Sequence, residues 1–185
     1  MHQEITEMRS SRTSRLLVVC AEAEAPGPES LADRCWLLAE ALADNHDVIL
    51  GLPAVTQLSH PDFAVVYYNG RNVGMVARDS DAIISDARAL ADFPTILEAG
   101  KPVAVDLAGA GDNDAGLTEV IASADFFFCA SETDRGAWLE ALKVAGRVNE
   151  HTLDGDSSLR RLLETVRPED RIQPLIEYCA APWYS

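Results

Sequence analysis

Long apolar runs and basic residues are both scarce in this sequence. The N-terminal residues 1–15 are polar and charged where a signal peptide needs an apolar core. No later apolar run approaches the roughly 18 residues that a membrane helix requires. We therefore expect a cytoplasmic protein without a membrane span.

Positive charge is too sparse for a polyanion-binding surface. The chain has 15 basic residues against 30 acidic ones, a formal net charge of −15, and no stripe of Lys and Arg interleaved with aromatic residues. Because nucleic-acid phosphates are bound by Lys and Arg that displace counterions, we expect no nucleic-acid partner. The same charge opposes docking on anionic lipid.

Paired cysteine motifs are missing as well. The four cysteines form no C-x-x-C pair and lie far apart in the sequence, in apolar settings such as LLVVCA and DFFFCA; they are Cys20, Cys35, Cys129 and Cys179. A domain of 185 residues can bury about two thirds of its unfolded surface in one core, so it needs no disulfide. We interpret all four as buried reduced thiols rather than metal ligands.

Phosphate-binding loops and a convincing catalytic base are also absent. The first loop, residues 21–30, contains neither G-x-G-x-x-G nor G-x-x-x-x-G-K-[ST], and Glu22 and Glu24 stand where a pyrophosphate needs neutral backbone donors. We therefore expect no cofactor. The four histidines suggest no histidine–serine–acid set and are interpreted as structural or surface residues; they are His2, His46, His60 and His151.

Short apolar segments rich in Val, Ile and Phe alternate with helical patterns along the chain. The predicted strands are residues 15–21, 46–52, 62–68, 81–86, 102–108 and 125–131. Most are apolar throughout, which is typical of strands covered on both faces. One face of the first predicted helix carries Leu31, Cys35, Leu38 and Leu42. The pattern predicts a single α/β domain with a Rossmann-like, doubly wound, mostly parallel sheet of about six strands.

The alternation of strands and helices ends near Gly146. We expect a flexible N-terminal tail over residues 1–14, the Rossmann-like domain over residues 15–166, and a C-terminal tail over residues 167–185. A last helix is predicted from about Asp156 or Ser157 to Val166. The tail that follows is apolar enough to pack back on the domain.

In a doubly wound sheet, ligands bind beyond the carboxyl ends of the strands, where the strand order reverses. The candidate acceptor-binding or ligand-binding residues in those loops are Gly27, Ser30, Asp86, Asp106, Ser131 and Glu132. Each has a structural alternative: a turn and cap for Gly27 and Ser30, turn formation near Asp106, and helix capping for Ser131. Asp106, Asp112 and Asp114 could bind sugar hydroxyls or a hard cation, but the spacing of an EF-hand is absent, and no metal site is expected.

Three segments resemble the group 1, retaining family of GT-B glycosyltransferases, in particular its bacterial members. DRCWLLAEALADNHDVILGLP (residues 33–53) resembles the family's first helix and second strand, and DAIISDARALADFP (residues 81–94) its fourth strand and following helix. The most specific match runs from C-A-S-E through G-R-V-N to L-R-R-L within residues 124–166. The resemblance implies the N-terminal, acceptor-side domain of such an enzyme.

Departures from the family pattern shape the functional hypothesis. A glycine that approaches the donor phosphates is replaced here by Ser30 or Leu31, the lip after Asp106 is shorter, and nothing corresponds to the second domain that binds the nucleotide sugar. The final PLIEYCAAP resembles the far C-terminus of full-length relatives, as if the donor domain were absent and both flanks retained.

Two functions therefore remain open. The first is a glycosyltransferase-like acceptor-side domain for a glycan or glycolipid, inactive alone and associated with a nucleotide-sugar-binding partner chain or a full-length glycosyltransferase. The second is a non-catalytic binding or regulatory protein on the same fold. Transfer needs both substrates held in a closed cleft, and one wall of that cleft is missing.

Overall fold

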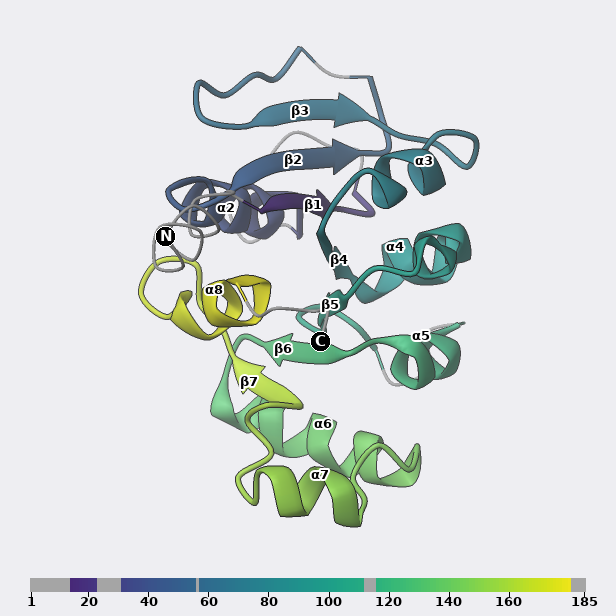
Figure 1. Cartoon of the computed structure of the whole chain (residues 1–185), viewed down its shortest axis with the longest axis vertical. Helices are drawn as coiled ribbons and strands as arrows, with labels where there is room; N and C mark the ends of the chain where they lie inside the picture. The colour runs from purple at the N-terminus through teal and green to yellow at the C-terminus, as the bar shows by residue number, and fades with distance from the viewer. Residues whose placement is uncertain (1–13, 23–30, 56, 112–115, 181–185) are drawn as a thin grey trace, which may run out of the picture.

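The computed structural model describes residues 14–22, 31–55, 57–111 and 116–180. Within these residues, seven parallel strands form one sheet in the order β3-β2-β1-β4-β5-β6-β7 (Figure 1). The strands are β1 (Arg15–Val19), β2 (Asp47–Leu52), β3 (Ala64–Tyr67), β4 (Ala82–Asp86), β5 (Val103–Asp106), β6 (Phe126–Cys129) and β7 (Leu163–Thr165). The predicted α/β, Rossmann-like fold is confirmed, with seven strands instead of about six.

Helices cover both faces of the sheet, because alternate strand residues point to opposite sides. In β1, Leu17 and Val19 join the core under one set of helices, whereas Leu16 and Val18 join the core under the other. The first set consists of α3 (Val73–Arg78), α4 (Ala87–Asp92), the 3₁₀ helix η1 (Pro94–Ala99), α5 (Leu117–Ser123) and α6 (Glu132–Val144). Figure 1 shows α3, α4 and α5 on one side of the sheet and α2 (Leu31–Ala43) and α8 (Gln173–Ala180) on the other.

The helix nearest the N-terminus packs as its periodicity predicts. Cys35, Leu38 and Leu42 of α2 are buried against the sheet, while the side chain of Leu31 lies outside the described part. In α8, Leu175 and Cys179 are buried in the same core. The predicted flexible tail lies outside the described residues, apart from Ser14. Trp183 also lies outside them. No helix in the described segments is long and apolar enough to cross a membrane.

The prediction of a helix near residues 156–166 is wrong. The helix in this region is α7 (Glu150–Gly155), which ends before Asp156 and starts at a capping box made by Asn149 and Thr152. Residues 163–165 instead form strand β7, and Leu163 pairs with Phe127 of β6. Leu163, Glu164 and Thr165 are all buried, so pairing with β6 and burial on both faces outweigh the helix propensity of the Leu and Glu residues.

Candidate functional site

Strand order reverses between β1 and β4, so the crevice at the carboxyl ends of these strands is the expected ligand position. Two candidate residues end neighbouring strands there. Asp86 closes β4 and Asp106 closes β5, and the two are partners in the strand register. Each is only 3% exposed. The structure therefore brings these two predicted carboxylates together, and both are buried at the carboxyl ends of their strands.

Backbone amides occupy both oxygens of the Asp86 carboxylate. Oδ2 accepts a hydrogen bond from the backbone N–H of Ala21 at 2.6 Å, and Oδ1 accepts one from Ala89 at 2.7 Å. The second bond caps α4, which begins directly after the strand. Burial raises the pKa of Asp86 to about 6, although these amide bonds act in the opposite direction. Asp86 therefore ties the end of β1 to the start of α4.

Asp106 is held by a guanidinium from α2. Arg34 donates from Nε to Oδ2 at 2.5 Å and from Nη2 to Oδ1 at 3.3 Å, and Nη2 also donates to the carbonyl of Val166 at 3.0 Å. The backbone N–H of Ala108 adds a bond at 3.0 Å. Burial raises the pKa of Asp106, and the charge of Arg34 lowers it in part. Arg34 thus joins α2, β5 and the end of β7.

Sequence reasoning did not identify Arg34 as part of this edge. The available signal was its position beside Cys35, on a helix whose apolar stripe faces the sheet. The guanidinium carbon also lies 5.9 Å from the centre of the Phe128 ring, within the range of a cation–π contact. A charged side chain so placed needs a buried acid, and the strand-end Asp106 supplies it.

Ser131 performs the capping role that was its structural alternative. Its Oγ accepts the backbone N–H of Asp134 at 3.1 Å at the start of α6, and its hydroxyl donates to the Asp134 carboxylate at 2.6 Å. The cap therefore differs from a reciprocal capping box, because the acid bonds to the hydroxyl. This hydroxyl is engaged in holding the helix end.

Glu132 belongs to a charged cluster beside β7. It accepts from the hydroxyl of Thr165 at 2.8 Å and pairs with Arg160 at 3.2 Å and with Arg171 at 3.7 Å. The Thr165 bond and then the Arg160 bond hold the pKa of Glu132 below its usual value. Both arginines also pair with the buried Glu164. Glu132 is about half exposed, so it is accessible from solvent at the carboxyl edge.

Two of the predicted positions cannot be placed. Gly27 and Ser30 lie outside the described residues, as do Asp112 and Asp114. Among the described histidines, none follows a strand at the carboxyl edge next to Asp86 or Asp106. His46 is buried before β2, where burial lowers its pKa, His60 stacks on Phe63, and His151 lies in α7. The described part of the edge thus offers carboxylates but no imidazole base.

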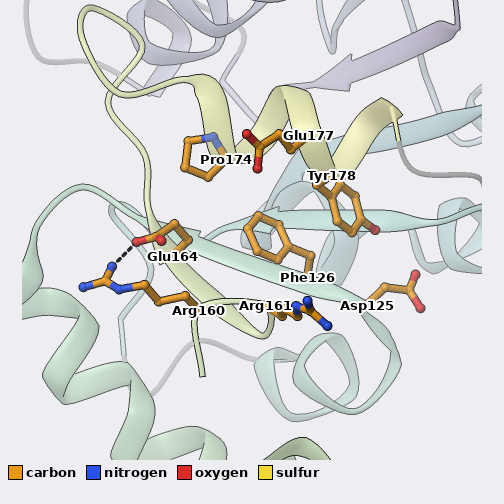
Figure 2. Close-up of a pocket in the computed structure, with 8 residues that line it drawn as sticks. All are labelled: Asp125, Phe126, Arg160, Arg161, Glu164, Pro174, Glu177 and Tyr178. Carbon is orange, nitrogen blue, oxygen red and sulfur yellow. Dashed lines mark hydrogen bonds and ion pairs between the residues drawn. The ribbon is translucent and has the colours of Figure 1, made fainter. Parts of the chain in front are cut away.

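A pocket of about 510 Å³ lies beneath α8; its lining includes Arg160, the ion-pair partner of Glu132, but none of the candidate residues themselves. Figure 2 shows Pro174, Glu177 and Tyr178 of α8 on one side and Arg160, Arg161 and Glu164 on the other. Phe126 and Tyr178 stack with ring centres 4.8 Å apart and form its apolar wall. Its volume is in the range of small-molecule sites, and apolar walls with a few charged groups are typical of them. Sequence patterns missed it because α8 and β6 are distant in the chain.

All four cysteines are buried and free, so the expected buried thiols are confirmed. The structure adds a juxtaposition that their sequence spacing hid. The sulfur atoms of Cys20 and Cys35 and a carboxylate oxygen of Asp86 all lie within 4.8 Å of one another. Cys20 follows β1 and Cys35 faces the sheet from α2, so the fold brings them to the β1–β4 crevice.

No protein-family model and no curated protein matches the chain. Similar solved structures include the glycosyltransferase SnogD from Streptomyces nogalater, with 19% identity and a TM-score of 0.43 over 82% of this chain and 37% of that one. Phytolacca americana UGT2 complexed with UDP-2fluoro-glucose and pterostilbene has 12% identity and a TM-score of 0.42, covering 75% of this chain and 36% of its own. eIF2B beta from Chaetomium thermophilum has 9% identity and a TM-score of 0.38, covering 67% of this chain and 45% of its own. The chain thus spans less than half the length of each of these neighbours.

Proposed function

We propose that this chain is an acceptor-side, glycosyltransferase-like domain that does not transfer sugar alone and is completed by a partner chain that binds the nucleotide sugar. The sequence resemblance to group 1 GT-B enzymes, carried by residues 33–53, 81–94 and 124–166, motivates the reaction class. A retaining hexosyl transfer to a glycan or glycolipid is the corresponding activity of the complete pair.

Exposed apolar side chains near the carboxyl edge are the observation that carries the partner. Five large hydrophobic residues in the described segments are exposed. Three of them lie at or after the ends of β2 and β3, the two strands at one side of the sheet. Val55 lies three residues beyond β2, Tyr67 ends β3, and Met75 lies in α3 just after it; Leu52 and Tyr67 are register partners. Exposed apolar side chains that follow neighbouring strands at the same end of a sheet are consistent with a protein interface.

The engagement of the edge residues supports dependence on that partner. The Asp86 carboxylate is hydrogen-bonded to backbone amides, the Asp106 carboxylate is paired with Arg34, and Ser131 caps α6. Among the described candidate residues, Glu132 is the exposed one, and its carboxylate, which already pairs with Arg160, can accept further hydrogen bonds from acceptor hydroxyls. Binding an acceptor without holding the donor gives no rate advantage, because transfer requires both to be held in line.

The experiment compares wild type with Met75→Asp and with Val144→Asp, an exposed apolar residue at the far end of α6. Tagged chains are purified from the native cell, co-purifying proteins are identified, and transfer of labelled sugar from a UDP-sugar is measured. We expect a nucleotide-sugar-binding chain with wild type and Val144→Asp but much less with Met75→Asp. Transfer activity should require both chains.

Two outcomes contradict the proposal. One is that no nucleotide-sugar-binding chain co-purifies and calorimetry detects no UDP-sugar binding to the isolated protein. The other is that the isolated chain transfers sugar at the rate of the mixture.

The pocket under α8 favours a second candidate function, a non-catalytic binding protein. The stacked Phe126 and Tyr178 could face the apolar side of a sugar ring, while Arg161 and Glu177 could bond its hydroxyls. Calorimetry with a panel of sugars tests this function, with Arg161→Ala as the pocket variant and Arg78→Ala, on α3, as the control. Equal affinity in both variants would exclude the pocket as the binding site.

A further inference from the structure

We propose that Cys20, Cys35 and Asp86 form a binding site for one Zn²⁺ ion at the β1–β4 crevice. The inference does not depend on the proposed transferase function. It starts from a contrast between the two buried strand-end carboxylates. Asp106 has a guanidinium partner in Arg34 at 2.5 Å. Among the described residues, no Lys or Arg forms an ion pair with Asp86, which faces two thiols instead.

A buried carboxylate without a cation is costly, and a metal ion would remove that cost. Asp86 is 3% exposed, and Cys20 and Cys35 are 0% and 3% exposed. An ionised acid in such a place is normally paired or bound to a metal. Two thiolates and one carboxylate carry a charge of about −3, which a divalent cation reduces to about −1.

The ligand atoms are close enough for a tetrahedral metal. They lie within 4.8 Å of one another. Bond lengths of about 2.3 Å to sulfur and about 2.1 Å to oxygen place the ligands of a tetrahedral zinc roughly 3.5 to 3.8 Å apart. The side chains therefore need to close by about 1 Å at most, which is within the reach of small rotations about their Cα–Cβ bonds.

The choice of zinc follows from the donor set. Thiolates favour soft or borderline metals over Mg²⁺ and Ca²⁺, and a mixture of sulfur and oxygen donors in a tetrahedral arrangement suits Zn²⁺. Binding replaces the protons of the two thiols, which pass to the buffer. Three protein ligands leave one position for a water or a small ligand, as in catalytic zinc sites.

Surrounding bonds hold the three ligands in place, as the outer partners of metal ligands do. The backbone amides of Ala21 and Ala89 fix the Asp86 carboxylate, and the hydroxyl of Tyr68 donates to the Cys20 carbonyl at 2.8 Å. The sulfur atoms of Cys20 and Cys35 lie within 4.8 Å of each other. The thiols thus already face each other across the crevice.

The test uses the full chain, reduced, stripped of metal with a chelator and then titrated with Zn²⁺ or Co²⁺ alone. We expect one Zn²⁺ per chain by elemental analysis and a rise in melting temperature. Co²⁺ should give sulfur-to-metal charge-transfer absorption that Zn²⁺ abolishes.

Variants assign the ligands. Cys20→Ser, Cys35→Ser and Asp86→Asn should each weaken Zn²⁺ binding by more than the roughly 10- to 100-fold that loss of an outer partner costs. The matched control is Cys179→Ser, which alters a buried thiol in the same core layer and should bind Zn²⁺ as wild type does.

Three results would overturn the proposal. They are no Zn²⁺ binding by reduced wild type at micromolar concentration, a Co²⁺ complex without sulfur charge transfer, and unchanged affinity in the Cys20→Ser/Cys35→Ser double variant. Because the first two use unaltered protein, they decide the matter even if a variant fails to fold.

Discussion

Replacing Arg34 by methionine tests whether the buried ion pair holds the carboxyl edge together. Methionine keeps the length and apolar body of the side chain but removes two hydrogen bonds to Asp106 and one to the carbonyl of Val166. The Arg34 side chain is 16% exposed and that of Asp106 4%, so solvent cannot compensate for the loss. The variant leaves Asp106 buried with no charged partner.

The expected cost is about 3 to 5 kcal/mol, the range for breaking a buried pair by removing one member. For a chain of this size that corresponds to a drop in melting temperature of roughly 6 to 20 °C. In an Asp106→Asn background the same change should cost only about 1 kcal/mol, because it then removes mainly the bond to Val166. The difference between the two backgrounds measures the pair.

The pH dependence of this loss has a definite sign. Burial raises the pKa of Asp106 and Arg34 lowers it in part, so the variant raises it further. A folded-state pKa above the unfolded value means stability that is present at low pH and lost as pH rises through the folded pKa. The deficit of Arg34→Met should therefore be smaller at about pH 5 than at about pH 7.

Urea unfolding followed by far-ultraviolet circular dichroism measures all four proteins of this cycle at both pH values. The reasoning is refuted if Arg34→Met costs less than about 1 kcal/mol near neutral pH, well below the range for a broken buried pair. It is also refuted if the loss is the same in both backgrounds to within about 0.5 kcal/mol, the usual limit of additivity.

Three further predictions concern the strand ends and helix starts. Burial raises the pKa of Asp86 from 3.8 to about 6, so ionisation of this one carboxyl should subtract about 3 kcal/mol of stability as pH rises through that interval, while Glu132, whose pKa is lowered, contributes with the opposite sign. The slope of stability against pH should therefore be more positive in Asp86→Asn than in wild type, and an unchanged slope contradicts the assignment. Ser131→Ala should cost about 1 kcal/mol in chemical unfolding by removing the α6 cap, whereas Thr133→Ala, exposed in the same turn, should cost clearly less. Gly116→Ala should lower the melting temperature more than Gly100→Ala. Both glycines have positive φ, but a Cβ at position 116 would lie 2.9 Å from the Cβ of Ala91 in α4, while a Cβ at position 100 would meet open space. Equal losses in the two variants would contradict a steric cost at Gly116.

Prediction of the sheet from sequence succeeded where the signal was local. The six apolar segments from residues 15 to 131 are continuous runs of strand-forming residues, and each contains an observed strand. β7 failed this test because Leu163 and Glu164 are good helix formers. Their strand conformation arises from pairing with β6, a contact between residues more than thirty positions apart.

The candidate site shows the same division. Asp86 and Asp106 could be named because any aspartate that ends a parallel strand must lie at the carboxyl edge, whatever the rest of the chain does. Ser131 could be named, with its alternative, because helix capping depends on only four residues. The placement of Gly27 and Ser30 stays a prediction.

Composition and local periodicity therefore determined the net negative charge, the α/β class and the strand ends of this protein, since those properties depend on residue counts or on residues close together in the chain. The partners of those strand ends were set by the three-dimensional fold. Arg34 reaches Asp106, and Cys35 reaches Cys20 and Asp86, only because α2 lies across the sheet. Contacts between distant segments are determined by how whole layers pack, and no spacing within the sequence encodes them.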